Sequence, residues 1–124
     1  MTPEPIFEVT KAAHFDAAHH FPEGPEGSPY RRMHGHSFRV EATVRGPASG
    51  AMGWVVDLGE LETRLKGVAG ELDHGLLNDK PGLENPTLER LCVWFAQRLR
   101  GEYPGLKRVV LSRPTIGESC ALEL

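Results

Sequence analysis

The 124-residue sequence contains few cysteines, no cluster of basic residues and no long apolar segment. Cys92 and Cys120 are too few for a disulfide-rich scaffold, so we expect both to be reduced thiols. The net charge is −3, and the lack of a basic patch argues against nucleic-acid binding. No apolar run approaches the roughly 20 residues of a membrane-spanning helix. The first residues also lack a signal-peptide pattern, so we expect a cytoplasmic protein without membrane contact.

The length and composition predict a single globular domain over residues 1–124. The apolar share of 40% and the charged share of 25% are ordinary for a soluble protein, and the chain is long enough to build a core. No internal repeats or low-complexity segments occur. The unusual feature is histidine, because five of the six histidines lie between positions 14 and 36.

Two of these histidines lie two residues apart at the start of an alternating segment. His34 and His36 share the parity of Phe38 and Val40, so a strand would place all four side chains on one face. An imidazole is costly to bury without a polar partner, and neutral imidazole is a common zinc ligand. The pair alone leaves open both a metal site and a chance occurrence.

A third histidine precedes them. Residues 6–19 predict a long strand in which His19 shares a face with Phe15. Residues 21–29 contain three prolines and two glycines and must form a loop. If that loop turns the chain back, a hairpin would bring His19 beside His34.

Two amphipathic helices are expected next. Leucine and valine recur at helical spacing over residues 58–72, and Asp57 is the expected N-cap. A second helix is expected to begin with Asn85 as its cap and Pro86 at its first position. Its inner stripe includes Cys92, which we interpret as a core thiol.

Two more strands are expected at residues 106–111 and 117–124. Strands grouped apart from helices predict an α+β fold, with a four-stranded antiparallel sheet and two helices on one face. Such a small sheet has open edges, which proteins often close by forming oligomers. Between the helices, Asp73 and His74 are adjacent; this pair is either solvated surface or a proton-transfer pair.

Five motifs in a fixed order resemble those of the 6-pyruvoyltetrahydropterin synthase family, which includes the 6-carboxytetrahydropterin synthases of the queuosine pathway. They are FDAAH at 15–19, MHGHSF at 33–38, GWVVDL at 53–58, LDHGLLN at 72–78 and NPTLE at 85–89. The resemblance implies the T-fold and subunits that pair edge to edge as a homo-oligomer, in trimeric barrels usually stacked into hexamers. It implies Zn²⁺ held by His19, His34 and His36 with an open coordination position.

The resemblance also implies a reaction. The substrate would be the pterin 7,8-dihydroneopterin triphosphate, and the enzyme a lyase that cleaves or rearranges its side chain. Asp73 and His74 match the proton-transferring pair of the family. Thr87 and Glu89, from the NPTLE motif, are candidate substrate-binding residues.

The sequence departs from the family pattern in two places. Tyr30 stands where the family has its catalytic cysteine, and its phenol is a poorer base than a thiol near neutral pH. Glu23 or Glu26 on the loop is a candidate replacement, with Glu26 the one we assign. One branch of the family uses a glutamate in place of the cysteine and releases 6-hydroxymethyl-dihydropterin.

The second departure concerns the residue that anchors the pterin ring. The family has a glutamate directly after the penultimate strand, and this sequence has Arg113 there. Glu118 reaches the same place only if the following loop differs. Three interpretations therefore stay open: a zinc-dependent pterin lyase, a family member acting on a different heterocycle with Arg113 facing an acidic group, and a zinc-binding protein without catalytic activity.

Overall fold

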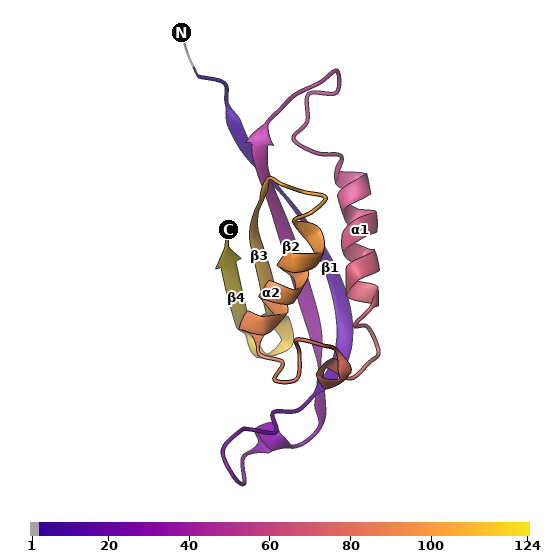
Figure 1. Ribbon diagram of the computed structural model, residues 1–124, viewed down its shortest axis with the longest axis vertical. Helices are drawn as coiled ribbons and strands as arrows, with labels where there is room; N and C mark the ends of the chain where they lie inside the picture. Colours follow the sequence, from indigo (N-terminus) through magenta and orange to yellow (C-terminus); the bar gives the residue numbers. More distant parts are fainter. Residues whose placement is uncertain (1–2) are drawn as a thin grey trace.

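The computed structural model describes residues 3–124 as one antiparallel sheet with two helices on one face (Figure 1). The strand order β1-β2-β3-β4 follows the chain. The strands are β1 (Ile6–His19), β2 (His34–Pro47), β3 (Leu106–Arg113) and β4 (Glu118–Glu123), and the helices are α1 (Leu58–Gly70) and α2 (Leu88–Leu99). Short 3₁₀ turns cover Pro29–Arg31, Leu77–Asp79 and Pro114–Ile116. The predicted α+β architecture is confirmed.

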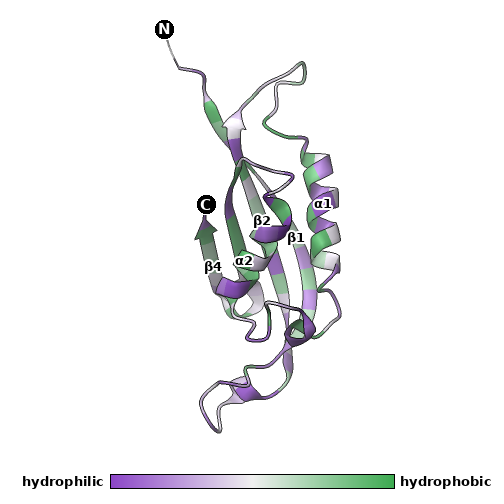
Figure 2. Ribbon diagram, viewed as in Figure 1, coloured by the Kyte–Doolittle hydropathy of each residue, from purple (hydrophilic) through white to green (hydrophobic). Residues whose placement is uncertain are grey.

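The core lies between the sheet and the helices, where alternate residues of each strand are apolar. Phe15 of β1 pairs with Phe38 of β2, and their rings stack with centroids 5.0 Å apart. Val40 and Leu111 continue this layer and are fully buried. The alternation of apolar and polar residues along the strands is visible in Figure 2. It directs one side chain of every two into the core.

The hairpin of β1 and β2 is the longest pairing in the sheet. Its register places His19 opposite His34 and Ala17 opposite His36. The loop over residues 20–33 projects beyond the end of the sheet (Figure 1). The predicted hairpin is therefore confirmed, and it brings the histidines of the two strands to one end of the core.

The helix boundaries confirm one predicted cap and correct the other. Asp57 caps α1 by accepting hydrogen bonds from the backbone N–H groups of Gly59 at 2.9 Å and Glu60 at 3.3 Å. The cap of α2 is Thr87, whose hydroxyl accepts from the N–H of Arg90 at 3.1 Å. The prediction of Asn85 as the cap was wrong by two residues, because the backbone is still extended at Thr87 and the helix begins only after it.

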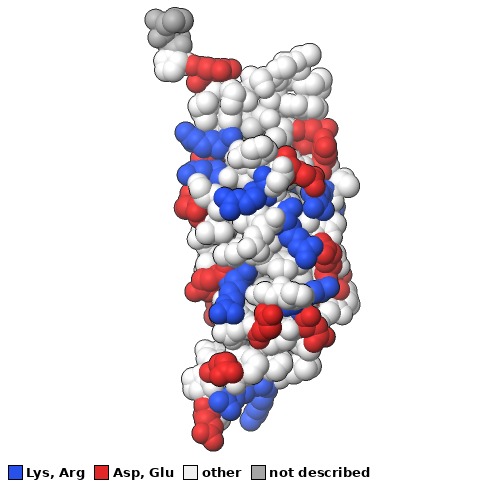
Figure 3. All heavy atoms as spheres, viewed as in Figure 1, with Lys and Arg blue, Asp and Glu red and all other residues white. Residues whose placement is uncertain are grey.

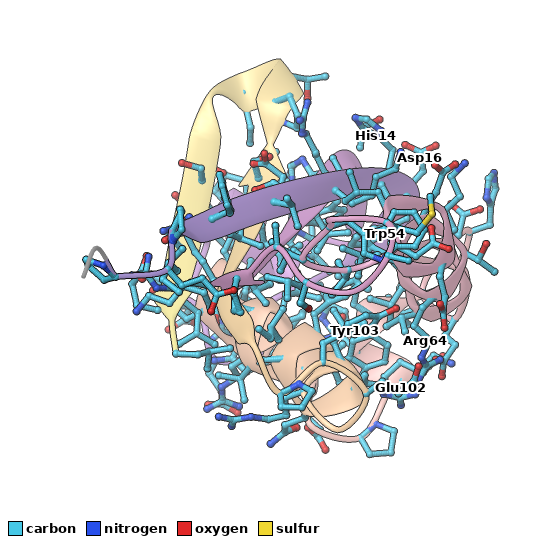
Figure 4. The ribbon with its side chains drawn as sticks, turned by 90° about the horizontal axis from the view of Figure 1, so that it is seen from above. His14, Asp16, Trp54, Arg64, Glu102 and Tyr103 are labelled. Atoms are coloured by element: carbon cyan, nitrogen blue, oxygen red, sulfur yellow. The ribbon has the colours of Figure 1, made fainter. Side chains whose placement is uncertain are left out.

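The helices and the opposite face of the sheet carry the charged residues. On the helix side, positive and negative side chains are interspersed rather than segregated (Figure 3). On the other side of the sheet no helix packs among the described residues, and His14 and Asp16 point away from the helix layer that contains Tyr103 (Figure 4). No helix between residues 3 and 124 has the length and apolar character needed to cross a membrane.

Candidate metal centre and its cavity

Three histidine side chains converge at the end of the core where the β1–β2 hairpin meets the loop. One nitrogen from each of His19, His34 and His36 lies within 4.8 Å of the others. His19 is fully buried, and the other two are half-buried. All three lie on the helix-facing side of their strands, directly after the layer formed by Phe15 and Phe38. The alternation that builds the core therefore also aligns the histidines.

The hydrogen bonds around the rings orient them for metal binding. Nδ1 of His34 donates to the backbone carbonyl of Arg32 over 2.7 Å, which leaves its Nε2 as the free nitrogen. This Nε2 lies 3.1 Å from Nε2 of His19. Nδ1 of His19 is buried without a hydrogen bond, although the carbonyl of Pro86 is near enough to raise its pKa slightly. The two rings thus direct lone pairs to a common point.

The environment favours the neutral form of His19 and His36, which is the form that binds a metal ion. Burial is the main cause that lowers the pKa of His19 to about 4, followed by repulsion from His34 and His36. Burial also lowers the pKa of His36, and the positive charge of Arg113 lowers it further. These residues can therefore hold a metal ion without losing protons near neutral pH.

A cavity of about 400 Å³ opens directly onto His34 and His36. Its other lining residues come from the loop, from the segment before α2 and from the β3–β4 turn: Phe21, Glu23, Gly24, Tyr30, Asn85, Arg113, Ile116 and Glu118. The cavity therefore combines aromatic and aliphatic surface with two carboxylates and one guanidinium group. Such a mixture is typical of sites for small polar heterocycles.

The two departures predicted near this site are both on the cavity wall. Tyr30 lines it with its side chain 59% exposed and its ring packed edge-on to Phe21. Glu23 also lines it, whereas Glu26 is exposed on the loop and is not one of the lining residues. Between the two candidate glutamates, the structure therefore brings Glu23, and not the assigned Glu26, to the histidines.

Arg113 and Glu118 face each other at the β3–β4 turn. They are partners in the strand register, and Nε of Arg113 lies 2.9 Å from Oε1 of Glu118 in an ion pair whose angle falls short of a hydrogen bond. The 3₁₀ turn between them is closed by Gly117, which adopts the left-handed conformation that glycine tolerates best. This tight turn brings Glu118 to the cavity. From the sequence we expected Glu118 to reach this place only if the loop differed from that of the family.

Asp73 and His74 form a hydrogen-bonded pair beside a second cavity. Nδ1 of His74 lies 2.8 Å from Oδ2 of Asp73, whose Oδ1 accepts from the backbone N–H of Asp16 at 2.9 Å. The Asp16 N–H and then His74 lower the pKa of Asp73, and the hydrogen bond to Asp73 raises the pKa of His74. The second cavity, of about 590 Å³, is lined by both His74 and His36. His36 is thus a lining residue of both cavities.

Two sequence-predicted residues lie outside both cavities. Thr87 caps α2, and Glu89 is exposed in the first turn of that helix. The sequence analysis missed Asn85, which lines the first cavity, and Ser37, which donates a 2.6 Å hydrogen bond to Asp16 beside the second. Both are inside the quoted motifs, and their place in those motifs was the available signal.

The profile of the 6-pyruvoyl tetrahydropterin synthase family matches residues 8–123, a span that includes the histidines and both cavities. The chain belongs to this family. It is 41% identical over 107 residues to a 6-carboxy-5,6,7,8-tetrahydropterin synthase of Synechocystis, covering 82% of this chain and 81% of that protein.

Two further comparisons agree with this assignment. The chain is 37% identical over 102 residues to a dihydroneopterin monophosphate aldolase of Pyrococcus furiosus, covering 80% of this chain and 82% of that protein. The structure of Caenorhabditis elegans 6-pyruvoyl tetrahydropterin synthase superimposes with a TM-score of 0.84 at 21% identity, covering 100% of this chain and 99% of that one. This family member therefore has the T-fold, and its curated relatives are enzymes.

Proposed function

We propose that this family member is a zinc-dependent lyase that acts on the side chain of 7,8-dihydroneopterin triphosphate or a close relative. The observation that carries the proposal is the convergence of His19, His34 and His36 beside the 400 Å³ cavity, which His34 and His36 line. Buried imidazoles with converging lone pairs have no structural explanation as good as a metal ion. The polar cavity beside them supplies room for a heterocyclic substrate.

A set of three histidines is a ligand set that suits Zn²⁺. Tetrahedral coordination with Zn–N bonds of about 2.0–2.1 Å puts neighbouring ligand nitrogens about 3.3 Å apart. The two Nε2 atoms of His19 and His34 are 3.1 Å apart, close to that value. A set of three histidines leaves one position for substrate, and bound zinc would supply polarisation of the substrate's side-chain hydroxyl groups. Asp16, the carboxylate of the FDAAH motif, faces the other side of the sheet.

Glu23 is the proposed proton acceptor in place of the family cysteine. It lines the cavity with His34 and His36, and a carboxylate is a competent base when it is placed within reach of a polarised hydroxyl group. Tyr30 shares this wall of the cavity. We propose that the substrate packs against the aromatic wall that Tyr30 forms with Phe21.

The Asp73–His74 pair is proposed to move a second proton. Asp73 holds the imidazole by a 2.8 Å hydrogen bond and raises its basicity, while the backbone N–H of Asp16 keeps the carboxylate ionised. The side chain of His74 is 80% exposed in the single chain. His74 and His36 both line the second cavity, which we propose as the route between the pair and the metal centre. That Thr87 and Glu89 contact the substrate stays a prediction.

A second candidate function is aldol cleavage of dihydroneopterin monophosphate to a 6-hydroxymethyl pterin. The relative from Pyrococcus furiosus bears that name, at 37% identity over 102 residues. A glutamate at the cavity and a tyrosine at the cysteine position favour this branch over carboxy-pterin formation. In this reaction a base takes the proton of a side-chain hydroxyl and the adjacent carbon–carbon bond breaks. The hydroxyl-bearing fragment leaves as an aldehyde, and the carbon that stays attached to the ring is protonated.

We also propose that the protein is a homo-oligomer. The outer edge of β1, except for a bridge between Ala18 and Leu76, and the outer edge of β4 have no strand partner within residues 3–124. Long open edges are commonly closed by association of copies. Light scattering of the purified protein distinguishes a trimer or hexamer from a monomer.

Turnover with identified products tests the function. Zinc-loaded protein is incubated with dihydroneopterin triphosphate or monophosphate, and the products are identified by mass. We expect a lyase product whose identity names the branch, loss of turnover after zinc chelation, and recovery when zinc is returned. Glu23→Gln should lower kcat at least tenfold while zinc stays bound, and Glu26→Gln, the matched loop control, should leave it unchanged. No product from either substrate would contradict the proposal.

A further inference from the structure

The side chain of Asn78 holds the end of β1 next to the proposed metal ligand His19. Pairing with β2 ends where His19 lies opposite His34, so the backbone groups of the next residue, His20, have no partner in that strand. Asn78 supplies both bonds: its Oδ1 accepts from the N–H of His20 at 3.1 Å, and its Nδ2 donates to the carbonyl of His20 at 2.8 Å. A primary amide offers both a donor and an acceptor, so here it takes the place of a peptide group in a neighbouring strand.

The same amide also holds the segment that precedes α2. Nδ2 of Asn78 donates to the carbonyl of Glu84 over 3.3 Å. Two residues later comes Pro86, whose carbonyl lies near the imidazole of His19, and Nδ1 of that ring is buried without a hydrogen bond. A carbonyl in such a position orients a metal-binding imidazole through its second nitrogen. Asn78 therefore connects the strand that carries His19 with the segment that faces its ring.

The outer edge of β1 is attached on both sides of His19. Before it, the N–H of Ala18 donates to the carbonyl of Gly75 over 2.9 Å, within a short parallel bridge. After it, Asn78 binds the N–H and the carbonyl of His20, directly before the chain enters the projecting loop. Of these two attachments, only that of Asn78 depends on a side chain, so a substitution can remove it.

Resting on the proposed function, we infer that Asn78 is a positioning residue that sets the place of His19 within the zinc ligand set. His19 is fully buried and lies opposite His34, with the two Nε2 atoms 3.1 Å apart. Without the amide, three backbone groups lose a partner, and the end of β1 gains freedom to move relative to β2. All three histidines remain, so the change falls on how they are arranged. Weaker metal binding with an altered geometry is the expected consequence.

Metal binding by the purified protein tests the inference without turnover. Asn78→Ala removes all three hydrogen bonds, and we expect zinc affinity, measured by competition with a chromogenic chelator, to fall about 10- to 100-fold. The visible absorption spectrum of bound Co²⁺ should also change, because it depends on the number and arrangement of the ligands. Asn78→Leu keeps the branched shape of the side chain without its hydrogen bonds. It should show the same changes, and it keeps the experiment decisive if Asn78→Ala does not fold.

Two control variants separate positioning of the ligand from a general loss of stability. Asp79→Ala truncates the neighbouring, exposed residue of the same 3₁₀ turn, and it should keep both the zinc affinity and the cobalt spectrum. Leu106→Ala removes a buried side chain that pairs with Val44, at the end of β2 far from His34. It should lower the stability and leave the cobalt spectrum unchanged. Circular dichroism and thermal unfolding of the metal-free proteins confirm folding and compare the stabilities.

The outcomes separate this inference from the proposed function. Unchanged zinc affinity and cobalt spectrum in folded Asn78→Ala or Asn78→Leu would overturn the inference, even if the parent protein turns over dihydroneopterin phosphates. An equal change of the spectrum in Leu106→Ala would also overturn it, because the effect would then be one of stability. Failure of the parent protein to bind zinc would contradict the metal centre and the inference together. The expected changes in metal binding, without turnover by the parent protein, would support the inference while contradicting the proposed lyase.

Discussion

The two faces of the sheet are built from the same strands and differ in almost every physical property. On the helix side, Phe15, Phe38 and Val40 are buried. On the open side, Glu8 of β1 contacts both Arg45 of β2 and Arg108 of β3 at 3.1 Å. The comparison shows that residues one position apart in a strand have different surroundings, because their side chains point to opposite faces of the sheet. One face forms the core, and the other stays solvated.

At one end of the sheet the buried face carries the histidines. The face that carries Phe15 and Phe38 continues as His19 and His36, so the proposed metal centre extends the core. The open face ends in Asp16 and Ser37, whose hydrogen bond lies beside the Asp73–His74 pair. The groups proposed to take part in the reaction are thus divided between the faces, and His36 lines both cavities.

The core face should give the largest effect on stability. Phe38 is fully buried and stacks on Phe15, so Phe38→Ala removes a large side chain from packed surroundings. We expect the free energy of unfolding to fall by about 3–5 kcal/mol, measured by denaturant titration. Arg39→Ala, one position away on the open face, is the control. An equal loss in both variants would contradict the division between the faces.

The next largest effect is expected from removing a histidine of the proposed metal centre, and it concerns zinc affinity. His34→Ala removes the ligand whose ring is already oriented by Arg32, and we expect zinc affinity to fall at least about 100-fold. A competition titration with a chromogenic chelator measures it. His14→Ala, an exposed histidine of the same sheet on its open face, should keep full affinity. Undiminished zinc binding by His34→Ala would refute the assigned ligand set.

A substitution in the Asp73–His74 pair should shift the pH profile of kcat. The hydrogen bond from Asp73 raises the pKa of His74, so turnover that needs the neutral imidazole falls as the pH drops through that raised value. Asp73→Asn removes the charge, so the acid limb of the kcat profile should move to lower pH. Profiles of both proteins on the same substrate measure the shift. An unmoved acid limb would show that another group titrates.

The smallest effect on stability is expected from a substitution on the open face of the sheet. Arg108 and then Arg45 lower the pKa of Glu8, so the stabilisation by its charge is present above the ordinary value of 4.5 and is lost as the pH falls through the lowered value. Glu8→Gln should therefore destabilise the protein slightly at neutral pH and low salt. Denaturant titration in 1 M salt should find no difference, because salt screens exposed charges. A loss that persists there would indicate packing instead.

Sequence reasoning found the elements but not all of their ends. The period of two correctly assigned His19, His34 and His36 to one face, and the Asp57 cap of α1 is confirmed. The cap of α2 was misplaced because Asn85 and Thr87 are both good capping residues. Only the backbone conformation after Pro86 selects between them.

The amino-acid sequence by itself determined the strands, the common face of the histidines and the hairpin that joins them, because these follow from local periodicity and turn residues. Tertiary structure decided which distant groups share a cavity. Glu23 rather than Glu26 lines it, and the turn closed by Gly117 sets Glu118 against Arg113. Such proximity depends on how loops pack at the end of the sheet, and no periodic pattern encodes that packing.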